Sequence, residues 1–507
     1  MSEPLNETLP EEWVDLINNF QQLHSDAQAM GRPEKLEKRS AAGLLNARER
    51  VELLVDPGSF NEIGTLVGMV EHQGLPAAPA DALVGGTATI DGRPVVVGSE
   101  DATVQGGSIG IGTHAKRMRL ASIAHRERVP LVMLLDGAGE RVTNALQRHP
   151  YAPNDMQEMA ALSHKVPTIA AVMGASAGHG AITGLLSDIV IMVQDGAIFS
   201  AGPPLVAEAL GEIISKEDLG GASVHAFSGV VHNIAAGERE ALDMIRDYLS
   251  YLPTNAWQYP PAQENSQDCG PRKLNGILHS LPRDGKQAYD IREIIQQLVD
   301  RNEFRQFNPD FGPSIITGFA RLGGQSIAIV ANQPSVMAGS ITRDAADKAA
   351  YFIDLANAYH LPVIFLADNP GIMSGSAAEK IGTLRSAAGM YRAQCKLSTP
   401  KLHVTLRKAY GFGSSLMGMN PFDKQTISYA FPGIALGGVP ASSGGTAAKM
   451  RDEERAFMIQ MEREGWSKAA DSLAYDEVID PRDLRSKLLA GLRLSTGRLT
   501  EAPKPKH

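Results

Sequence analysis

The sequence predicts an α/β protein of two domains, one of which repeats the other. Its 507 residues exceed what a single hydrophobic core normally supports. Short apolar runs typical of buried strands alternate with segments of helical spacing. A glycine-rich stretch after such a run, at residues 171–181, has a counterpart at residues 407–415. We therefore expect a mostly parallel, helix-covered sheet in each half.

Composition narrows the functional classes. A net charge of −9, 50 glycines and only 6% aromatic residues fit a glycine-turn-rich α/β enzyme and lack the basic footprint of a nucleic-acid-binding protein. The two cysteines, Cys269 and Cys395, form no CxxC motif or Cys/His cluster, so we expect neither a disulfide framework nor a metal site. The sequence shows no signal peptide and no apolar run of transmembrane length, which predicts a soluble, cytoplasmic protein without a membrane contact.

The first half begins with an N-terminal helical segment, residues 1–58. Helical spacing predicts helices over 11–20 and 47–55, which we interpret as a lid or a dimer contact. The first domain then spans residues 59–252 and opens with a hairpin around Asp91-Gly92. A helix over 113–128 and four buried strands follow, at 131–135, 168–173, 188–193 and 197–200.

The second half repeats this order. Residues 253–284 are rich in Pro, Asn, Gln and Gly and are predicted to be an interdomain linker, and a helix over 288–298 begins the second domain, 285–507. Landmarks recur at a fixed offset of 232 residues (362 − 130): Gly86, Gly92, Lys116 and Pro130 correspond to Gly318, Gly324, Lys348 and Pro362. The later pairs Pro167/Pro400 and Gly178/Gly411 are offset by 233 (400 − 167), so the register holds over nearly a hundred residues.

The two glycine stretches are the strongest functional signal. A glycine turn between a strand and a helix lets the backbone approach a ligand closely and presents free N–H groups, which can stabilise an enolate or another oxyanion. Tight packing of strand on helix is the alternative interpretation. Because the device occurs in both halves, we favour two anion-stabilising sites, which suit a group transfer between two carbonyl compounds.

Further passages carry a family resemblance by their joint order. They are residues 45–50 (LNARER), 56–60 (DPGSF), 99–101 (SED), 106–108 (GGS), 201–204 (AGPP), 217–221 (EDLGG) with His225, 315–334, 345–349, 368–371 (DNPG) and 476–481 (DEVIDP). From about residue 35 to the C-terminus, the chain resembles the carboxyltransferase (beta) subunits of biotin-dependent acyl-CoA carboxylases, the propionyl-CoA and methylcrotonyl-CoA carboxylase-like family.

The resemblance implies two tandem crotonase-like domains and a carboxyltransferase activity. The enzyme would transfer the carboxyl group of carboxybiotin to the α (or vinylogous) carbon of an acyl-CoA, with acyl-CoA at the N-terminal half and carboxybiotin at the C-terminal half. By position, the amides of Gly178 and His179 would stabilise the enolate, and those of Phe412 and Gly413 would stabilise biotin. Biotin itself would act as the base, so no catalytic triad is required.

The resemblance also implies partners. The chain shows neither a biotinyl domain nor an ATP-binding module, so we expect a separate biotin carboxylase and a biotinyl carrier. The family assembles as homo-oligomers, usually hexamers, with each active site between the N-terminal half of one subunit and the C-terminal half of its partner.

Several residues depart from the family pattern. His179 stands where the family has glycine and is either a donor or base, or a pocket-shaping residue, which we favour because no orienting partner is evident. Phe412 is expected to narrow the biotin side, and Ser415 occupies a position linked to acyl specificity. Near the CoA thioester, Gly137, Ala138 and Gly139 form either a substrate-binding turn or a plain connection, and Arg141 is either a phosphate contact or a surface charge.

Three other functions stay open at this point. The chain could serve as the carboxyltransferase subunit of an acyl-CoA decarboxylase, because direction depends on partners. It could be a biotin-independent crotonase-type acyl-CoA hydratase or hydrolase that uses His179. It could also be a non-catalytic assembly subunit whose altered turns no longer bind ligand.

Overall fold

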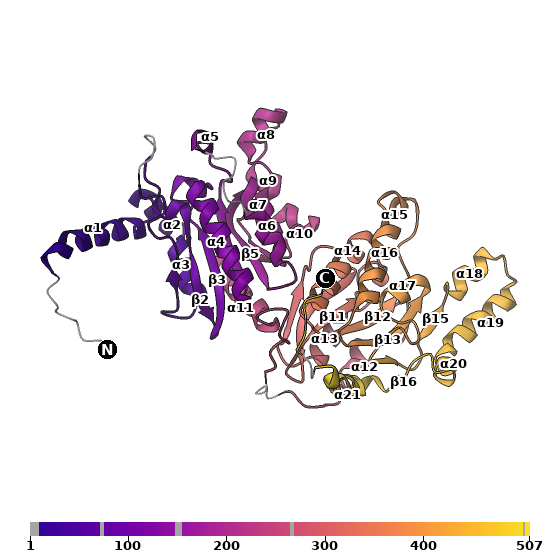
Figure 1. The fold of residues 1–507 in the computed structure, drawn as a ribbon. Coiled ribbons are helices and arrows are strands. Elements are labelled where there is room, and N and C mark those ends of the chain that lie inside the picture. The colour runs from indigo at the N-terminus through magenta and orange to yellow at the C-terminus, as the bar shows by residue number, and fades with distance from the viewer. Residues whose placement is uncertain (1–9, 71–75, 148–154, 264–267, 500–501, 507) are drawn as a thin grey trace. The chain divides into compact units, whose positions relative to one another are not determined.

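A computed structural model describes residues 10–70, 76–147, 155–263, 268–499 and 502–506. The chain divides into two compact units, Met1–Val224 with Ile234–Arg246, and His225–Asn233 with Asp247–His507 (Figure 1). The start of the predicted N-terminal segment (1–9) and residues 264–267 of the predicted linker lie outside the described residues.

The first sheet has the predicted mostly parallel form. Its strands run in the order β1-β2-β3-β4-β5-β6-β8, and β7 pairs with β5. The hairpin β2–β3 is antiparallel, whereas β3, β4, β5 and β6 pair in parallel. The strands are β1 (Asn61–Glu62), β2 (Leu83–Ile90), β3 (Arg93–Glu100), β4 (Leu131–Gly137), β5 (Thr168–Ala177), β6 (Ile189–Val193), β7 (Ala197–Phe199) and β8 (Asn233–Ala235).

Helices before and around this sheet confirm the predicted helical spacing. The helix α3 begins at a capping box in which Asn46 and Glu49 satisfy each other's backbone N–H groups. The helix α4 packs on β3 (Figure 1). The helices are α1 (Glu11–Gln28), α2 (Pro33–Ala41), α3 (Ala47–Leu54), α4 (Ile111–Glu127), α5 (Asn144–Gln147), α6 (Met156–Leu162), α7 (Gly178–Leu185), α8 (Pro203–Leu210), α9 (Lys216–Gly220), α10 (Ala222–Ser228) and α11 (Glu238–Tyr251).

The second sheet has the same topology as the first. Its order is β9-β10-β11-β12-β13-β14-β16, and β15 pairs with β13 as β7 pairs with β5. The strands are β9 (Phe304–Phe307), β10 (Ile315–Leu322), β11 (Gln325–Asn332), β12 (Val363–Asn369), β13 (Lys401–Tyr410), β14 (Ile427–Ala430), β15 (Ala435–Gly437) and β16 (Glu477–Val478).

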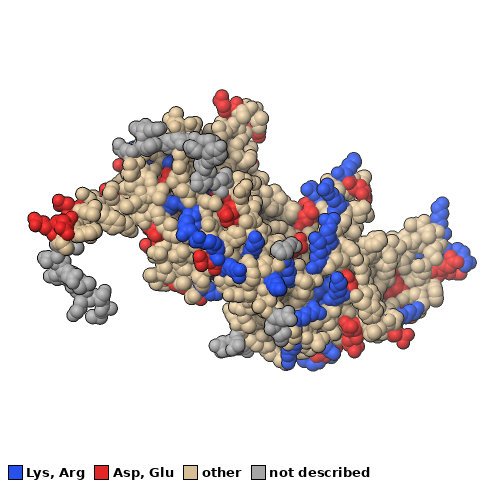
Figure 2. Space-filling view, in the orientation of Figure 1, with Lys and Arg blue, Asp and Glu red and all other residues tan. Residues whose placement is uncertain are grey.

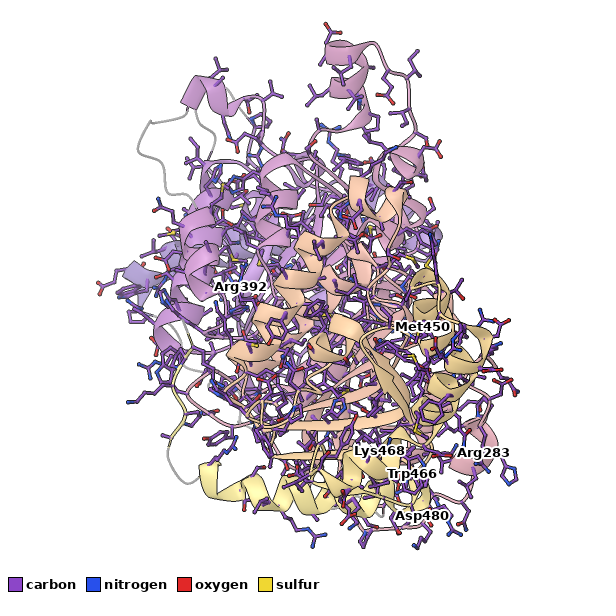
Figure 3. All side chains as sticks on the ribbon, turned by 90° about the vertical axis from the view of Figure 1, so that its right-hand side faces the viewer. Arg283, Arg392, Met450, Trp466, Lys468 and Asp480 are labelled. Carbon is purple, nitrogen blue, oxygen red and sulfur yellow. The ribbon has the colours of Figure 1, made fainter. Side chains whose placement is uncertain are left out.

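The second unit buries one face of this sheet in a large apolar core. Aliphatic side chains of β10–β13 meet those of α13 and α21 there, and Trp466 of α20 packs against them (Figure 3). The helix α14 packs on β10 and β11. The helices are α12 (Ile277–Ser280), α13 (Ile291–Leu298), α14 (Arg343–Ala358), α15 (Ser376–Lys380), α16 (Thr383–Lys396), α17 (Gly411–Leu416), α18 (Ala441–Ala447), α19 (Asp452–Arg463), α20 (Gly465–Asp471) and α21 (Leu484–Leu494).

The stretch predicted as a linker belongs to the second unit. Within residues 253–284, Leu274 and Ile277 are buried in the core of that unit, and Arg272 donates to the carbonyls of Gln297 and Val299. The weak periodicity and many prolines of this stretch reflect irregular backbone that is anchored by a few apolar side chains. The other predicted domain boundaries stay predictions.

The internal repeat extends to details of geometry. The amide of Asp136 donates to Glu100, and the amide of Asp368, 232 residues later, donates to Asn332. The pairing of β4 with β5 shifts register between Leu135 and Gly137, and the pairing of β12 with β13 shifts at the equivalent place. The two halves therefore share one backbone design.

Charge is distributed unevenly over the surface. Figure 2 shows Lys and Arg gathered over the second unit in the region of α14 and α16, and α16 contributes the exposed Arg385, Arg392 and Lys396. Among the described residues, no helix combines the length and the apolar character that a membrane crossing requires.

Candidate functional site

The N-terminal glycine stretch is a direct junction of strand and helix. The strand β5 continues to Ala177, four residues beyond its predicted end, and α7 begins at Gly178 without an intervening loop. Gly178 has φ +54°, a conformation that disfavours any residue with a Cβ. The amides of Gly178 and His179 belong to the first turn of α7, where N–H groups lack intrahelical acceptors.

The C-terminal stretch repeats this junction. The strand β13 ends at Tyr410, α17 begins at Gly411, and Gly411 has φ +55°. Gly413 is required for a second reason, since a Cβ there would lie 2.5 Å from Oδ1 of Asn369. The predicted pair of junctions is thus present with matched backbone geometry, although catalytic roles for Gly178, His179, Phe412 and Gly413 stay predictions.

Two side chains near the second junction differ in exposure. The ring of Phe412 is 80% exposed, whereas Ser415 is half-buried and donates from Oγ to Oδ1 of Asn420 at 2.8 Å. Most of the Phe412 side chain is therefore available to a ligand or another chain, while Ser415 is held by a neighbour.

The predicted CoA-side turn lies beside the first junction. Gly139 has φ +84°, and a Cβ there would lie 2.8 Å from the carbonyl oxygen of Ala177, the residue before Gly178. The amide of Ala138 donates to the carbonyl of Gly106, which anchors the turn. The structure therefore brings Gly137, Ala138 and Gly139 to the end of β5.

Arg141 is not a free surface charge. Its Nη1 donates to Oδ1 of Asp81 at 2.6 Å, and its Nε and Nη2 donate to Oγ and the carbonyl of Ser108. The guanidinium ties the turn to two other loops, and a role in binding phosphate stays a prediction.

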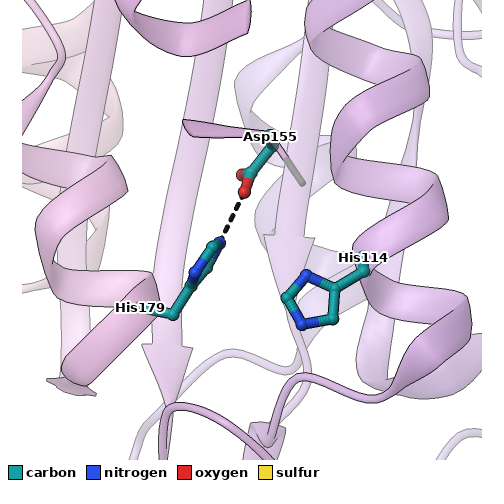
Figure 4. Close-up of side chains that lie close together, drawn as sticks. All are labelled: His114, Asp155 and His179. Atoms are coloured by element: carbon teal, nitrogen blue, oxygen red, sulfur yellow. Dashed lines mark hydrogen bonds and ion pairs between the residues drawn. The ribbon is translucent and has the colours of Figure 1, made fainter. Parts of the chain in front are cut away.

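His179 has the orienting partner that the sequence did not reveal. Its Nε2 donates to Oδ1 of Asp155 at 2.5 Å (Figure 4). Oδ2 of Asp155 accepts from Nε of Arg117 at 2.8 Å, and Nη1 of Arg117 donates to Glu100 at 2.7 Å. The interpretation of His179 as an isolated histidine is wrong, because Asp155 lies 24 residues away in sequence and meets it only through the fold.

Electrostatics shift the pKa values of the two carboxylates in this network in opposite directions. Burial alone would raise the pKa of Asp155, but the charge of Arg117 and the hydrogen bond from His179 hold it well below its usual value. Burial raises the pKa of Glu100, and the charge of Arg117 opposes that shift. Arg117 itself is buried between the two carboxylates and has a raised pKa because their attraction outweighs its desolvation.

His114 completes the polar cluster. It lies on α4, and its ring centroid is 5.0 Å from that of His179, edge to face. Its Nε2 is 2.9 Å from Glu140, and its Nδ1 is buried without a hydrogen-bond partner among the described residues. The sequence patterns did not predict His114, Glu140 or Asp155 as residues of the site.

Comparison of the two halves of the sequence could have pointed to this cluster. Adding the offset of 232 to Glu100, His114, Arg117 and Glu140, and 233 to His179, gives Asn332, Ala346, Ala349, Ile372 and Phe412. Polar or charged residues of the first half thus correspond to mostly apolar residues of the second. The shared fold does not need the cluster, which indicates a role specific to the N-terminal half.

Comparison with known proteins decides the family. The carboxyl transferase domain family matches residues 38–507. The chain belongs to the carboxyl transferase family. It is 33% identical to the methylmalonyl-CoA carboxyltransferase 12S subunit of Propionibacterium freudenreichii subsp. shermanii, over 95% of this chain and 94% of that protein. It is also 33% identical to the methylmalonyl-CoA decarboxylase subunit alpha of Veillonella parvula, over 95% of this chain and 96% of that protein.

Solved structures agree with this assignment. The transcarboxylase 12S crystal structure, a hexamer described with methylmalonyl-CoA and methylmalonic acid bound, superposes with a TM-score of 0.90 at 31% identity, covering 99% of both chains. The predicted resemblance, the two crotonase-like halves and the identification of this carboxyl transferase as an enzyme are therefore confirmed.

Proposed function

We propose that this carboxyl transferase moves a carboxyl group from carboxybiotin to the α carbon of an acyl-CoA. One observation carries the proposal: Gly178 and Gly411 begin equivalent helices with φ +54° and +55°, so both halves present the same pair of backbone amides. Carboxyl transfer develops negative charge on two oxygens, that of the acyl enolate and that of the biotin ureido group. Two matched pairs of N–H donors can stabilise the negative charge on these two oxygens.

The acyl-CoA belongs at the N-terminal junction in this proposal. Removal of the weakly acidic α proton of a thioester requires fixed donors at the enolate oxygen, which the amides of Gly178 and His179 provide. The turn at Gly137–Gly139 passes the end of β5 and would line the thioester. Methylmalonyl-CoA bound to the related 12S subunit supports a CoA thioester as the substrate class.

Carboxybiotin belongs at the C-terminal junction. When bound, biotin supplies the carboxyl group and the base. The residues present fit it, since the amides of Phe412 and Gly413 lie in the first turn of α17, where N–H groups lack intrahelical acceptors. The exposed Phe412 then covers the biotin side of the site.

Partners and assembly follow the relatives. A biotin-dependent long-chain acyl-CoA carboxylase beta4 subunit of Mycobacterium tuberculosis is 31% identical over 97% of this chain, and the 12S subunit is a hexamer. We propose a homo-oligomer, hexameric as in the 12S structure, that works with a biotin carboxylase and a biotinyl carrier in the cytoplasm. The related decarboxylase subunit keeps the reverse reaction as a second candidate.

The test is a reconstituted carboxylation. The chain is co-expressed with biotinylated carrier and biotin carboxylase proteins, and ATP-dependent incorporation of labelled bicarbonate is followed across a panel of acyl-CoAs. We expect incorporation into at least one acyl-CoA, with none in the absence of biotin. Hydration or thioester hydrolysis by the isolated chain, without incorporation, would contradict the proposal and favour the biotin-independent function.

A further inference from the structure

Three side chains from separate segments converge beside the N-terminal junction. His114 comes from α4, Asp155 immediately precedes α6, and His179 lies in the first turn of α7. One nitrogen or oxygen from each lies within 4.8 Å of the other two (Figure 4). Two imidazoles and one carboxylate form a ligand set that Zn²⁺ and similar ions prefer.

The ring of His114 has a nitrogen that could bind a ligand. Its Nε2 lies 2.9 Å from Oε2 of Glu140, and a proton on Nε2 leaves Nδ1 with a free lone pair. Nδ1 faces Asp155 and His179 in Figure 4 and has no partner among the described residues, although its side chain is only 4% exposed. A buried acceptor without a partner costs free energy, so this atom is an argument for a bound group.

The charges around the cluster favour a cation. Glu100, Asp155 and Glu140 are carboxylates, and Arg117 is the cation that hydrogen-bonds to the first two. Arg117 occupies only Oδ2 of Asp155, so Oδ1 stays directed at His179. The corresponding positions of the second half hold Ala346, Ile372 and Phe412, so the fold itself does not explain the histidines and Glu140.

We propose that Nδ1 of His114, the carboxylate of Asp155 and Nε2 of His179 bind a divalent transition-metal ion, Zn²⁺ being the best match. Metal–ligand bonds of about 2.0–2.2 Å place ligand atoms of one ion roughly 3–4 Å apart, so Nε2 of His179 and Oδ1 of Asp155, now 2.5 Å apart, must separate, and Nε2 must release its proton to bind the ion. Glu140 takes the part of the carboxylate that orients a metal-bound histidine. Three protein ligands leave a coordination position open. Binding of this ion does not require the proposed carboxyl transfer.

The sequence could not show this site as a motif. The ligands lie 41 and 24 residues apart (155 − 114 and 179 − 155), unlike the short spacings of zinc-finger or HExxH sites. The expectation of no metal site came from that absence alone.

The experiment uses the full-length protein and Co²⁺ as a spectroscopic substitute for Zn²⁺. Protein dialysed against a chelator is titrated with Co²⁺ at neutral pH, and visible d–d absorption is recorded alongside calorimetric stoichiometry. We expect one Co²⁺ per chain, displaced by Zn²⁺, and at least 100-fold weaker binding in His114→Ala and in His179→Gly. Glu140→Gln should weaken binding roughly 10- to 100-fold, as loss of an orienting carboxylate does.

A matched control distinguishes this site from surface binding. His125 also lies on α4 and also pairs with a carboxylate, Glu158 at 3.0 Å, but its side chain is 36% exposed. His125→Ala should bind Co²⁺ as the wild type does. No stoichiometric binding by the wild type, or equal binding by the His114→Ala and His125→Ala variants, would overturn the proposal. Circular dichroism of each variant verifies folding, and His114→Gln replaces any variant that fails to fold.

Discussion

Nε2 of His179 lies 2.5 Å from Oδ1 of Asp155, whose other oxygen accepts from Nε of Arg117 at 2.8 Å. The position of the imidazole is therefore set by a buried ion pair of its own unit. Whatever the ring contributes to the site, its orientation exists before substrate arrives, as preorganised sites require.

His179→Gly tests the division between main chain and side chain. We expect carboxyl transfer to persist, because the amide at position 179 remains, and the relative kcat/KM values across short and long acyl-CoAs to change by about tenfold, which corresponds to ~1.4 kcal/mol of altered pocket contact. The panel used for reconstitution provides the measurement. Complete loss of transfer in a folded variant would instead assign the chemistry to the imidazole.

Removal of Arg117 tests the stability of the network. Arg117→Met leaves Glu100 and Asp155 buried without their cation and should lower the free energy of unfolding by about 3–5 kcal/mol. Urea denaturation followed by circular dichroism measures the loss. Arg126→Ala, which breaks an exposed pair with Glu127, is the control and should change stability by less than about 1 kcal/mol. Equal effects in both variants would contradict the buried network.

Gly178→Ala and Gly411→Ala test the two junctions. Both force a Cβ onto a left-handed conformation and displace the following amide, so we expect kcat to fall roughly 10²–10³-fold, as loss of one oxyanion donor does. Transfer from a carboxylated acyl-CoA to free biotin gives kcat and both KM values. The KM for the acyl-CoA should change in Gly178→Ala, and the KM for biotin should change in Gly411→Ala.

The control variants place alanine at two other glycines that also have positive φ. Gly211 (φ +71°) and Gly382 (φ +78°) have no atom within 4 Å of an added Cβ and belong to neither junction. Alanine at either position should leave kcat within about twofold of the wild type, because a shift of ~0.4 kcal/mol changes a rate by only that factor. A fall in kcat equal to that of the junction variants would show that general destabilisation, and not displaced donors, lowers the activity.

Lys348 gives a pH dependence of stability. Burial lowers its pKa to about 7, from about 10.5 in the unfolded chain. Between these values the unfolded state holds more protons, so the free energy of unfolding should rise with pH, by up to about 4 kcal/mol between pH 7 and pH 10. Lys348→Met should flatten this rise, leaving the part that comes from other buried lysines such as Lys116 and Lys506, whose pKa values burial lowers to about 8.

Thermal unfolding at several pH values measures this effect. Lys380 is exposed on α15, and Lys380→Met should keep the pH profile of the wild type. A Lys348→Met profile as steep as the control would contradict the lowered pKa of Lys348.

Much of the fold could be predicted because its signals are local or periodic. The strands β4, β5, β6 and β7 each contain a continuous apolar run, and the repeat fixes the correspondence of the halves. The packing of residues 253–284 on the second unit was missed, since Leu274 and Ile277 carry no periodic pattern.

The site divides in the same way. Both glycine junctions follow from sequence, because positive φ and close approach restrict the residue type at Gly178, Gly411 and Gly413. The cluster around His179 does not, since His114 and Asp155 approach it only through tertiary packing. Only alignment of the two halves reveals that charged residues replace alanine and isoleucine there.

At each junction, the main chain and the side chains can have separate roles. The groups proposed to stabilise charge are main-chain amides, which every residue except proline supplies, so side chains at His179 and Phe412 are free to vary without removing the donors. The two halves share the backbone of this junction, and their side chains differ at these two positions. An exchange of residues 179 and 412 between the halves is therefore a natural starting point for redesigning substrate choice in this scaffold.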